Sequence, residues 1–222
     1  MPHDRTQRQN GRSQLPSFVS LMLSEPATTL TDYALALEAI VFAGCLIPLR
    51  QTACHFWSGA FVCLAIAAIL GGTFHGFIFW LDPTLHNWLW RLMLCALSGV
   101  SFCLLAASVV SAVPRSQQFG WWTIAAVKAV CFIGLALYLA NFGLGVADYL
   151  SAMVLMLMLQ LWGSSLRIAG WIAAGVLVSG FAAGVQQSGW AIGVFDANGL
   201  FHLVQMGAIG LFFQGARLSQ DL

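Results

Sequence analysis

The chain has 222 residues, of which 59% are hydrophobic and only 8% charged, and its formal net charge is +1. A soluble domain carries about 25% charged residues, so the composition excludes a soluble globular protein and predicts a membrane protein. Crossing the hydrocarbon core of a membrane takes about 20 mostly apolar residues. We therefore expect an all-α fold, a polytopic bundle of transmembrane helices in an integral, multi-pass membrane protein.

The first 26 residues are polar, and their opening letters MPHDRTQRQNGRSQLP contain three arginines and no helical periodicity. This composition is typical of a disordered tail. The short apolar stretch SFVSLMLSE follows, but Glu25 and Pro26 interrupt it, so we expect no cleaved signal peptide. A short interfacial helix is the alternative for this stretch. The predicted parts are a tail over 1–26, a helical domain over 27–217 and a C-terminal tail over 218–222.

Seven apolar stretches are long enough to cross a membrane. They are 30–49, 56–81, 88–112, 120–141, 145–163, 167–187 and 198–216. The connections are about 3 to 10 residues long, and short connections favour antiparallel packing of sequence neighbours. The sequence thus predicts a seven-transmembrane-helix bundle. The six cysteines are scattered through these stretches without a CxxC pair, so we interpret them as small apolar packing residues.

Polar side chains gather in one half of the predicted bundle. If consecutive spans alternate in direction, one half holds Asp32, Glu38, His75, Asp82, His86, Arg91, Asp148, Gln186, Gln187, Asn198, His202 and Gln205. An ionisable side chain at the centre of a span costs at least about 2.5 kcal/mol, so it usually faces the bundle interior and marks a site. Those close to span ends have an equal alternative, which is to reach the lipid headgroups. Glu38, His75 and His202 lie deeper, and we expect at least two of them to line a common polar cavity.

Helical spacing refines this expectation. Asn198, His202 and Gln205 follow each other at i, i+4 and i+7 and therefore share a face of the last helix. Asp82 lies seven residues after His75, about 10.5 Å along a helix axis, so the two cannot easily bind one metal ion. Pro83 tends to stop the helix after Asp82, which favours a role for Asp82 in orienting His86 or pairing with Arg91.

These residues resemble a known pattern. A seven-helix protein with a histidine late in helix 2, an acidic residue soon after it and NGLFHLVQ opening helix 7 is similar to the CREST superfamily, which contains alkaline ceramidases, PAQR receptors and Per1-like proteins. Its members share Ser-x-x-x-His in helix 2, an Asp near the start of helix 3 and His-x-x-x-His in helix 7. His75 and His202 match outright. Gly71 stands at the serine position and Asn198 at the first helix-7 histidine, while the Asp corresponds to Asp82 or to the neighbourhood of His86.

The resemblance implies a zinc-dependent hydrolase or a degenerate relative of one. His75 and His202 would hold the zinc ion, with Glu38, His86 or Asn198 as third ligand and water in the remaining position. Zinc-bound hydroxide would attack the amide or ester of a membrane lipid. Glu38 or Asp82 would act as general base and proton carrier.

Two other functions stay open on the residues alone. The polar cluster could be a structural network in a non-catalytic membrane subunit, receptor or scaffold, or the two histidines could be axial ligands of a haem. Membrane lipid is the expected partner, a protein partner within the bilayer stays open, and no nucleic-acid partner is expected.

Lys128 is the only lysine and lies near the middle of the fourth span. It should reach an acidic residue, a backbone carbonyl or a water-filled cavity unless it extends to the headgroups.

Overall fold

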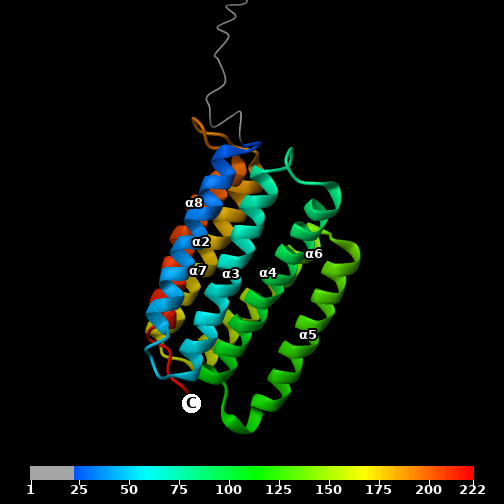
Figure 1. Ribbon diagram of the computed structural model, residues 1–222. Helices are drawn as coiled ribbons and strands as arrows, with labels where there is room; N and C mark the ends of the chain where they lie inside the picture. Colours follow the sequence, from blue (N-terminus) through cyan, green and yellow to red (C-terminus); the bar gives the residue numbers. More distant parts are fainter. Residues whose placement is uncertain (1–22) are drawn as a thin grey trace, which may run out of the picture.

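The computed structural model describes residues 23–222, so nearly all of the predicted tail, and most of the stretch for which an interfacial helix was the alternative, lie outside the described residues. Seven long helices make up the fold (Figure 1), and within residues 23–222 there is no strand beyond an isolated bridge between Ile192 and Phe195. The helices are α2 (Pro26–Leu46), α3 (Thr52–Gly76), α4 (Pro83–Ala112), α5 (Gln118–Leu139), α6 (Phe142–Gly163), α7 (Leu166–Ser188) and α8 (Ala197–Ala216). The all-α prediction is confirmed, and all seven are long and apolar enough to cross a membrane.

The boundary between α3 and α4 differs from the predicted one. α3 ends at Gly76, five residues earlier than expected, and α4 begins at Pro83, five residues earlier. Proline is favoured at the first helical position, where its missing N–H needs no partner. One carboxylate oxygen of Asp82 accepts hydrogen bonds from the backbone N–H groups of Thr84 (2.9 Å) and Leu85 (3.1 Å). Asp82 therefore caps α4 and is not part of the second helix.

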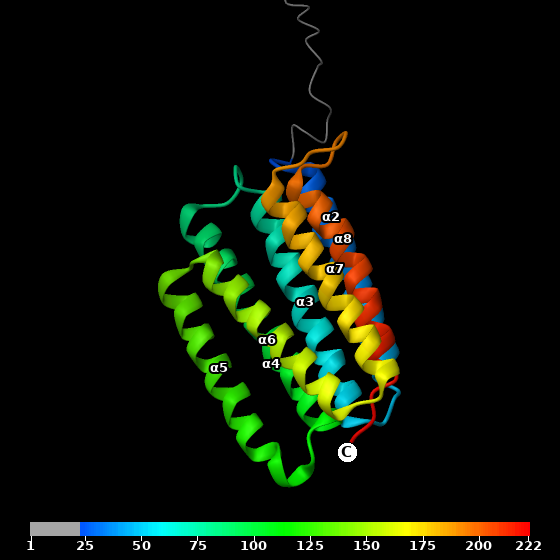
Figure 2. The same cartoon turned by 180° about the vertical axis from the view of Figure 1, so that it is seen from behind.

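Neighbouring helices in the bundle are mostly neighbours in the sequence. α3 packs against both α2 and α4, α8 packs against α2 and α7, and α4 also packs against α5 and α6. The first and last helices are thus side by side, which brings residues near 30 next to residues near 200 (Figure 1). Seen from behind, α5 lies at the outer edge and diverges from α6 (Figure 2).

The apolar core lies among α2, α3, α4, α6, α7 and α8, where Trp57, Met156, Ile172 and Phe212 are fully or almost fully buried. Small residues allow close helix contacts. A Cβ added at Gly163 would lie 1.7 Å from the carbonyl oxygen of Ala112, so only glycine permits the approach of α6 to the end of α4.

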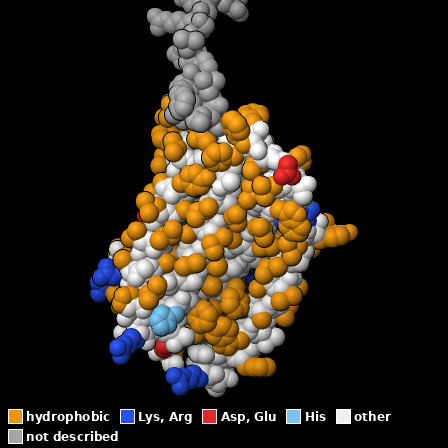
Figure 3. All heavy atoms as spheres, in the orientation of Figure 1, with side chains coloured by type: hydrophobic (Ala, Val, Ile, Leu, Met, Phe, Trp, Pro, Cys, Tyr) orange, Lys and Arg blue, Asp and Glu red, His pale blue; other side chains and the backbone are white. Residues whose placement is uncertain are grey.

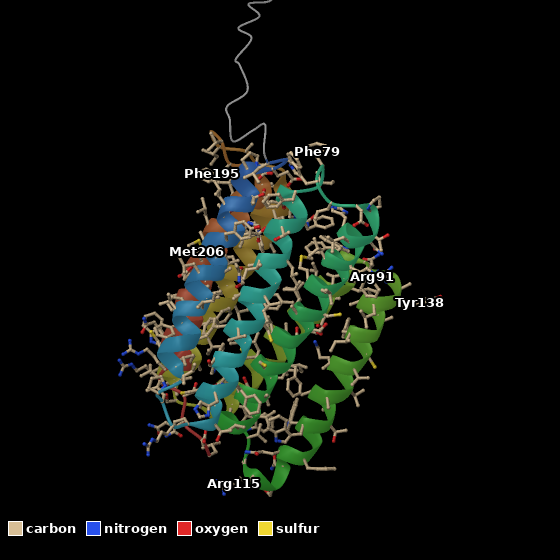
Figure 4. All side chains as sticks on the ribbon, in the orientation of Figure 1. Phe79, Arg91, Arg115, Tyr138, Phe195 and Met206 are labelled. Atoms are coloured by element: carbon tan, nitrogen blue, oxygen red, sulfur yellow. The ribbon has the colours of Figure 1, made fainter. Side chains whose placement is uncertain are left out.

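Two side chains of α4 hold the far end of α5. The indole N–H of Trp90 donates to the carbonyl oxygen of Ala140 at 2.9 Å, and the Arg91 guanidinium donates to the carbonyl oxygen of Leu137. Figure 4 shows Arg91 beside this end of α5, where Tyr138 is labelled. Arg91 thus stabilises a helix C-terminus, whose carbonyls favour a cation.

The C-terminal residues are bound to the opposite end of the bundle. The Asp221 carboxylate accepts hydrogen bonds from the backbone N–H groups of Thr52 and Ala53, both at 2.8 Å. The Asp221 N–H in turn donates to the Gln51 side chain at 3.1 Å. Asp221 therefore caps α3 from a position 169 residues later in the chain.

Asp221→Ala should lower the free energy of unfolding by about 1 kcal/mol near neutral pH, because α3 loses its cap. Partial burial raises the pKa of Asp221, but the N–H donors of Ala53 and Thr52 outweigh it and bring the pKa below its usual value. A carboxyl with a lowered folded pKa stabilises the fold above its unfolded pKa, and this contribution is lost as the pH falls through the folded value.

Thermal unfolding in detergent from pH 8 to pH 3 measures this pH-dependent contribution of Asp221. The difference in Tm between wild type and Asp221→Ala should be constant down to about pH 4, the usual range of an aspartate, and shrink below it. Gln220→Ala, an exposed neighbour in the same tail, is the matched control and should behave as wild type. A difference that persists undiminished at pH 3 would contradict the role of the carboxylate.

Candidate functional site

Polar side chains of α2 face α8 at the end of the bundle where α2 begins. The Thr28 hydroxyl donates to the Asp196 carboxylate, with distances of 2.9 and 3.1 Å to its two oxygens. Asp196 also accepts from the backbone N–H of Gly199 at 2.8 Å and so caps α8. These contacts set the register between α2 and α8 and place the next turn of α2 opposite His202.

His202 contacts α2 with both ring nitrogens. Its Nδ1 lies 3.0 Å from the Thr31 hydroxyl, and its Nε2 lies 3.2 Å from one carboxylate oxygen of Asp32. All three residues are buried, with exposed fractions of 8% for His202, 5% for Thr31 and 4% for Asp32. Adjacent residues of one helix thus hold both sides of one imidazole in the interior of the bundle.

Glycines of α3 make room for Asp32. A Cβ added at Gly71 would lie 3.5 Å from the Oδ2 atom of Asp32, and one at Gly72 would lie 3.0 Å from its Cβ atom. Asp32 Oδ2 is buried and forms no hydrogen bond within residues 23–222. The side chain therefore lies in a narrow space between α2, α3 and α8, with one oxygen on His202 and one free.

A second acid–histidine pair lies closer to the end of the bundle. His75 Nδ1 is 3.0 Å from a carboxylate oxygen of Glu25, and the Glu25 side chain is 45% exposed. The Ser24 N–H and hydroxyl donate to the carbonyl oxygen of Gly76 at 2.9 and 3.3 Å, which fixes the chain ahead of α2 against the end of α3. Asp32 lies against Gly71 of α3, and His75 follows one turn later on the same helix. The two pairs therefore lie towards the same end of the bundle, with Glu25 and His75 more exposed than Asp32 and His202.

The other predicted metal ligands lie elsewhere. The Asn198 side-chain oxygen accepts from Gln186 at 3.0 Å, and the His86 ring stacks on Phe74 with 3.9 Å between ring centroids. Within residues 23–222, no three His, Cys, Asp or Glu side chains gather closely enough to hold a metal ion. His75, His202, His86 and Asn198 do not converge, and the zinc site stays a prediction.

The two predicted general bases also stand apart from the histidines. Glu38 is half-buried, and one of its carboxylate oxygens forms no hydrogen bond among the described residues. It shares the face of Thr31 but lies seven residues later, about 10.5 Å along the axis, which places it past the level of His202. Asp82 is exposed and caps α4. The expectation that Glu38 lies close to a histidine is not met, and Asp32 takes that position.

Two positional features that the sequence predicts are confirmed. His202 and Gln205 are both buried and face the interior from one side of α8, as their spacing predicts. Gln205 donates to the Ser179 hydroxyl at 3.2 Å, and so extends the polar contacts deeper into the bundle. His75 and His202 lie towards the same end of the bundle, as alternating helix directions predict. Among residues 23–222 no hydrogen bond or ring contact joins them, so the shared cavity stays a prediction. Sequence reasoning placed Asp32 in this half of the bundle but left the lipid headgroups as an equal alternative, and it assigned no role to Thr31.

The family DUF6962, described as a family of unknown function, matches residues 27–221. The chain belongs to DUF6962. No curated protein and no solved structure matches the chain. The DUF6962 match includes Asp32, His75 and His202 and extends to Asp221, so it covers both the buried cluster and the bound C-terminal residues.

A separate ion pair of this DUF6962 chain lies between α5 and α6. The Lys128 ammonium donates to the Asp148 carboxylate and, at 2.7 Å, to the Asp148 carbonyl oxygen. The side chains are 11% and 1% exposed. The prediction that Lys128 reaches an acidic residue or a backbone carbonyl is confirmed on both counts.

Proposed function

We propose that the seven helices cross a membrane and that the function of the protein depends on proton exchange at the buried pair of Asp32 and His202. The helix lengths and hydropathy support the first part. Hydrophobic side chains cover most of the visible face, and several of the Lys and Arg side chains lie at its lower end (Figure 3). This is the distribution that a hydrocarbon environment favours, because charged groups are stable only near its edges.

The hydrogen bonds of His202 carry the proposal. The Thr31 hydroxyl has one hydrogen and lies 2.9 Å from the Ala27 carbonyl oxygen, four residues earlier, the usual acceptor for a threonine inside a helix. When the hydroxyl donates there, Nδ1 of His202 must carry hydrogen and donate to Thr31. The contact between Nε2 and Asp32 then needs one more proton, on the imidazole or on the carboxyl. The pair therefore shares an exchangeable proton and is neutral overall, which a low-dielectric interior favours.

Glu25 and His75 provide a route for that proton. Both are partly exposed, both can accept and donate protons, and His75 lies one turn after Gly71, which Asp32 contacts. Ionisable groups arranged in series within a membrane bundle are characteristic of proton relays. In the proposed function, protons pass between the membrane surface and Asp32 through these two side chains.

Infrared difference spectra of the purified full chain in detergent test the proposal. A change of pH should produce a carboxyl C=O band that shifts in D₂O and disappears in Asp32→Asn, which keeps the shape of the side chain but cannot ionise. Glu38→Gln is the matched control on the same helix and should keep the band. Glu25→Gln should slow the exchange of the band with D₂O without removing it. A spectrum unchanged by Asp32→Asn would refute proton exchange at this pair.

A zinc-dependent hydrolase of lipid amides or esters is the second candidate. The free Oδ2 atom of Asp32 favours it, because this buried acceptor lies against Gly71, one turn before His75, and its partner oxygen already contacts His202. Two imidazoles and one carboxylate are a common ligand set for catalytic zinc, and bound zinc would supply the hydroxide for hydrolysis. In the present arrangement the three side chains do not converge, so holding the ion would require them to move together.

Metal analysis of protein purified without chelator tests whether the protein binds zinc as this second candidate function requires. About one zinc ion per chain is expected if the site forms, and His75→Ala or His202→Ala should each remove it, because the remaining ligands would bind too weakly. Asn198→His adds the imidazole that the resemblance implies and should tighten binding. Absence of stoichiometric zinc in the wild type together with no gain in Asn198→His would exclude this candidate, whatever the infrared result.

A further inference from the structure

A cavity of about 280 Å³ lies at the end of the bundle opposite the pair of Asp32 and His202, where α6 ends and α7 begins. It is lined by the last residue of α6, the first turn of α7, the end of α4 and the residues that follow α8, and polar atoms of this lining are open to it. Sites for whole small molecules begin at about 300 Å³, so the cavity suits one small polar group such as a lipid headgroup.

The lining of this cavity offers free hydrogen-bond donors and a positive charge. The hydroxyls of Ser111 and Ser164 are used, because they donate to carbonyl oxygens of their own helices. The Ser165 oxygen accepts from the first turn of α7 at 3.4 Å, which leaves its hydrogen free to donate. Arg167 is exposed, and its guanidinium takes part in no hydrogen bond or ion pair within residues 23–222. Among the described residues no Asp or Glu lines the cavity, so its free groups favour an anion.

Positive charge also predominates around the cavity. Four arginines lie in connections or next to a helix end at this end of the bundle, and they are Arg50, Arg115, Arg167 and Arg217. Figure 3 shows several Lys and Arg side chains at this lower end. The Asp221 carboxylate caps α3, and Arg115 donates to the Leu222 oxygen at 3.1 Å, so these acceptors are already bound. Basic residues at a membrane boundary attract anionic lipids.

The surroundings of the cavity favour a lipid over a soluble anion. α7 has 23 residues. Its length is therefore about 35 Å, so its first turn lies at the edge of a hydrocarbon core about 30 Å thick. Trp162 and Leu166, which flank the lining residues in the chain, are 90% and 87% exposed. Exposed tryptophan at this level is typical of a membrane interface. A headgroup in the cavity would thus have its acyl chains beside apolar side chains.

We propose that the cavity binds the phosphate of an anionic phospholipid headgroup, with the Arg167 guanidinium and the Ser165 hydroxyl as donors. Two N–H groups of the guanidinium match two phosphate oxygens. A zwitterionic headgroup such as phosphocholine would bring its own cation to an end that is already basic, so an anionic headgroup binds better. The acyl chains leave the cavity past Leu166. This site rests on the membrane crossing in the proposed function and is independent of proton exchange at Asp32.

Native mass spectrometry of the full chain, released from vesicles of equal parts phosphatidylglycerol and phosphatidylcholine, tests the proposal. The wild type should retain one phosphatidylglycerol per chain, preferred over phosphatidylcholine by roughly tenfold. Arg167→Gln should abolish this preference, and Arg167→Lys, which keeps the charge without the paired donors, should retain part of it. Arg217→Gln is the matched control, because Arg217 lies at the same end over the Phe213 ring and outside the cavity lining. It should keep the preference.

Folding of the variants is checked separately. Arg167 is exposed and unbonded, so Arg167→Gln should unfold at the same temperature as the wild type in lipid-free detergent. A large excess of inorganic phosphate should leave the bound phosphatidylglycerol in place, because free phosphate lacks the acyl chains. Displacement by phosphate would overturn the proposal and identify a site for a soluble anion.

Three other results would also overturn the proposal. The first is equal retention of the two lipids by the wild type. The second is a preference that survives Arg167→Gln. The third is equal loss of the preference in Arg217→Gln, which would assign it to the whole basic end and not to the cavity. Protein that stays in carbonate-washed membranes without any lipid preference would refute this site and leave the membrane crossing intact. Loss of the protein in the wash would refute both.

Discussion

Replacement of Lys128 by methionine is expected to lower the free energy of unfolding by about 3–5 kcal/mol, because breaking a buried ion pair by removing one partner leaves an uncompensated charge. Asp148 is 1% exposed, and its second carboxylate oxygen forms no hydrogen bond within residues 23–222. Without the ammonium, the carboxyl must either remain charged in an apolar environment or take up a proton. Either outcome destabilises the packing of α5 against the bundle.

The double variant Lys128→Met with Asp148→Leu should recover most of this loss. A well-packed apolar pair often matches or exceeds a buried ion pair in stability, since no desolvation penalty remains. Denaturant unfolding of both variants in mixed micelles gives the two free energies. If Lys128→Met alone unfolds like the wild type, then Lys128 extends to the headgroups and the contact with Asp148 contributes nothing to stability.

His202→Leu should have the second largest effect, a loss of about 1–3 kcal/mol in the free energy of unfolding, together with loss of the pH-dependent change in the Asp32 carboxyl band. The expected loss is smaller than at Lys128 because the remaining Asp32 can hold the shared proton and stay neutral, so the main penalty is for unsatisfied polar groups. Thr31 also loses its contact with Nδ1. His55→Leu, an exposed histidine at the other end of the bundle, is the matched control and should stay within about 0.5 kcal/mol of the wild type.

A double-mutant cycle of His202→Leu and Asp32→Leu separates the pair from its surroundings. The two effects should be non-additive by about 1 kcal/mol or more, because each single variant leaves the other partner without its hydrogen bond. Additive effects would show that the two side chains do not interact in solution, and the 3.2 Å contact would then carry no functional argument.

The number and positions of the helices followed from the sequence because they depend on local properties. A stretch of about 20 apolar residues has to satisfy its backbone hydrogen bonds internally within a membrane, and the helix is the structure that does so. Seven such stretches were therefore recognisable without any tertiary contact. The gathering of Asp32, His75 and His202 at one end also followed, since short connections make consecutive helices alternate in direction.

The starts of helices near proline were harder to predict from the sequence. Glu25 and Pro26, and likewise Asp82 and Pro83, mark helix starts in the structure, while hydropathy alone places those starts several residues later. A cap such as Asp82 depends on one side chain and two backbone N–H groups. Hydropathy averaged over about 20 residues does not detect so local a feature. The role of Asp82 as a cap was nevertheless signalled by the proline that follows it.

The pairing of the polar side chains was decided only by the tertiary structure. Glu38 and Asp32 both offer a carboxylate from the same helix, and the axial register of α2 against α8 determines that Asp32 meets His202. That register depends on the contact of Thr28 with Asp196 and on the glycines of α3, and these residues are far apart in the sequence. Hydrophobic periodicity shows which side of a helix faces inward. It carries no information on the translation of one helix along another, because a shift of one turn leaves the apolar pattern almost unchanged while it exchanges every polar partner.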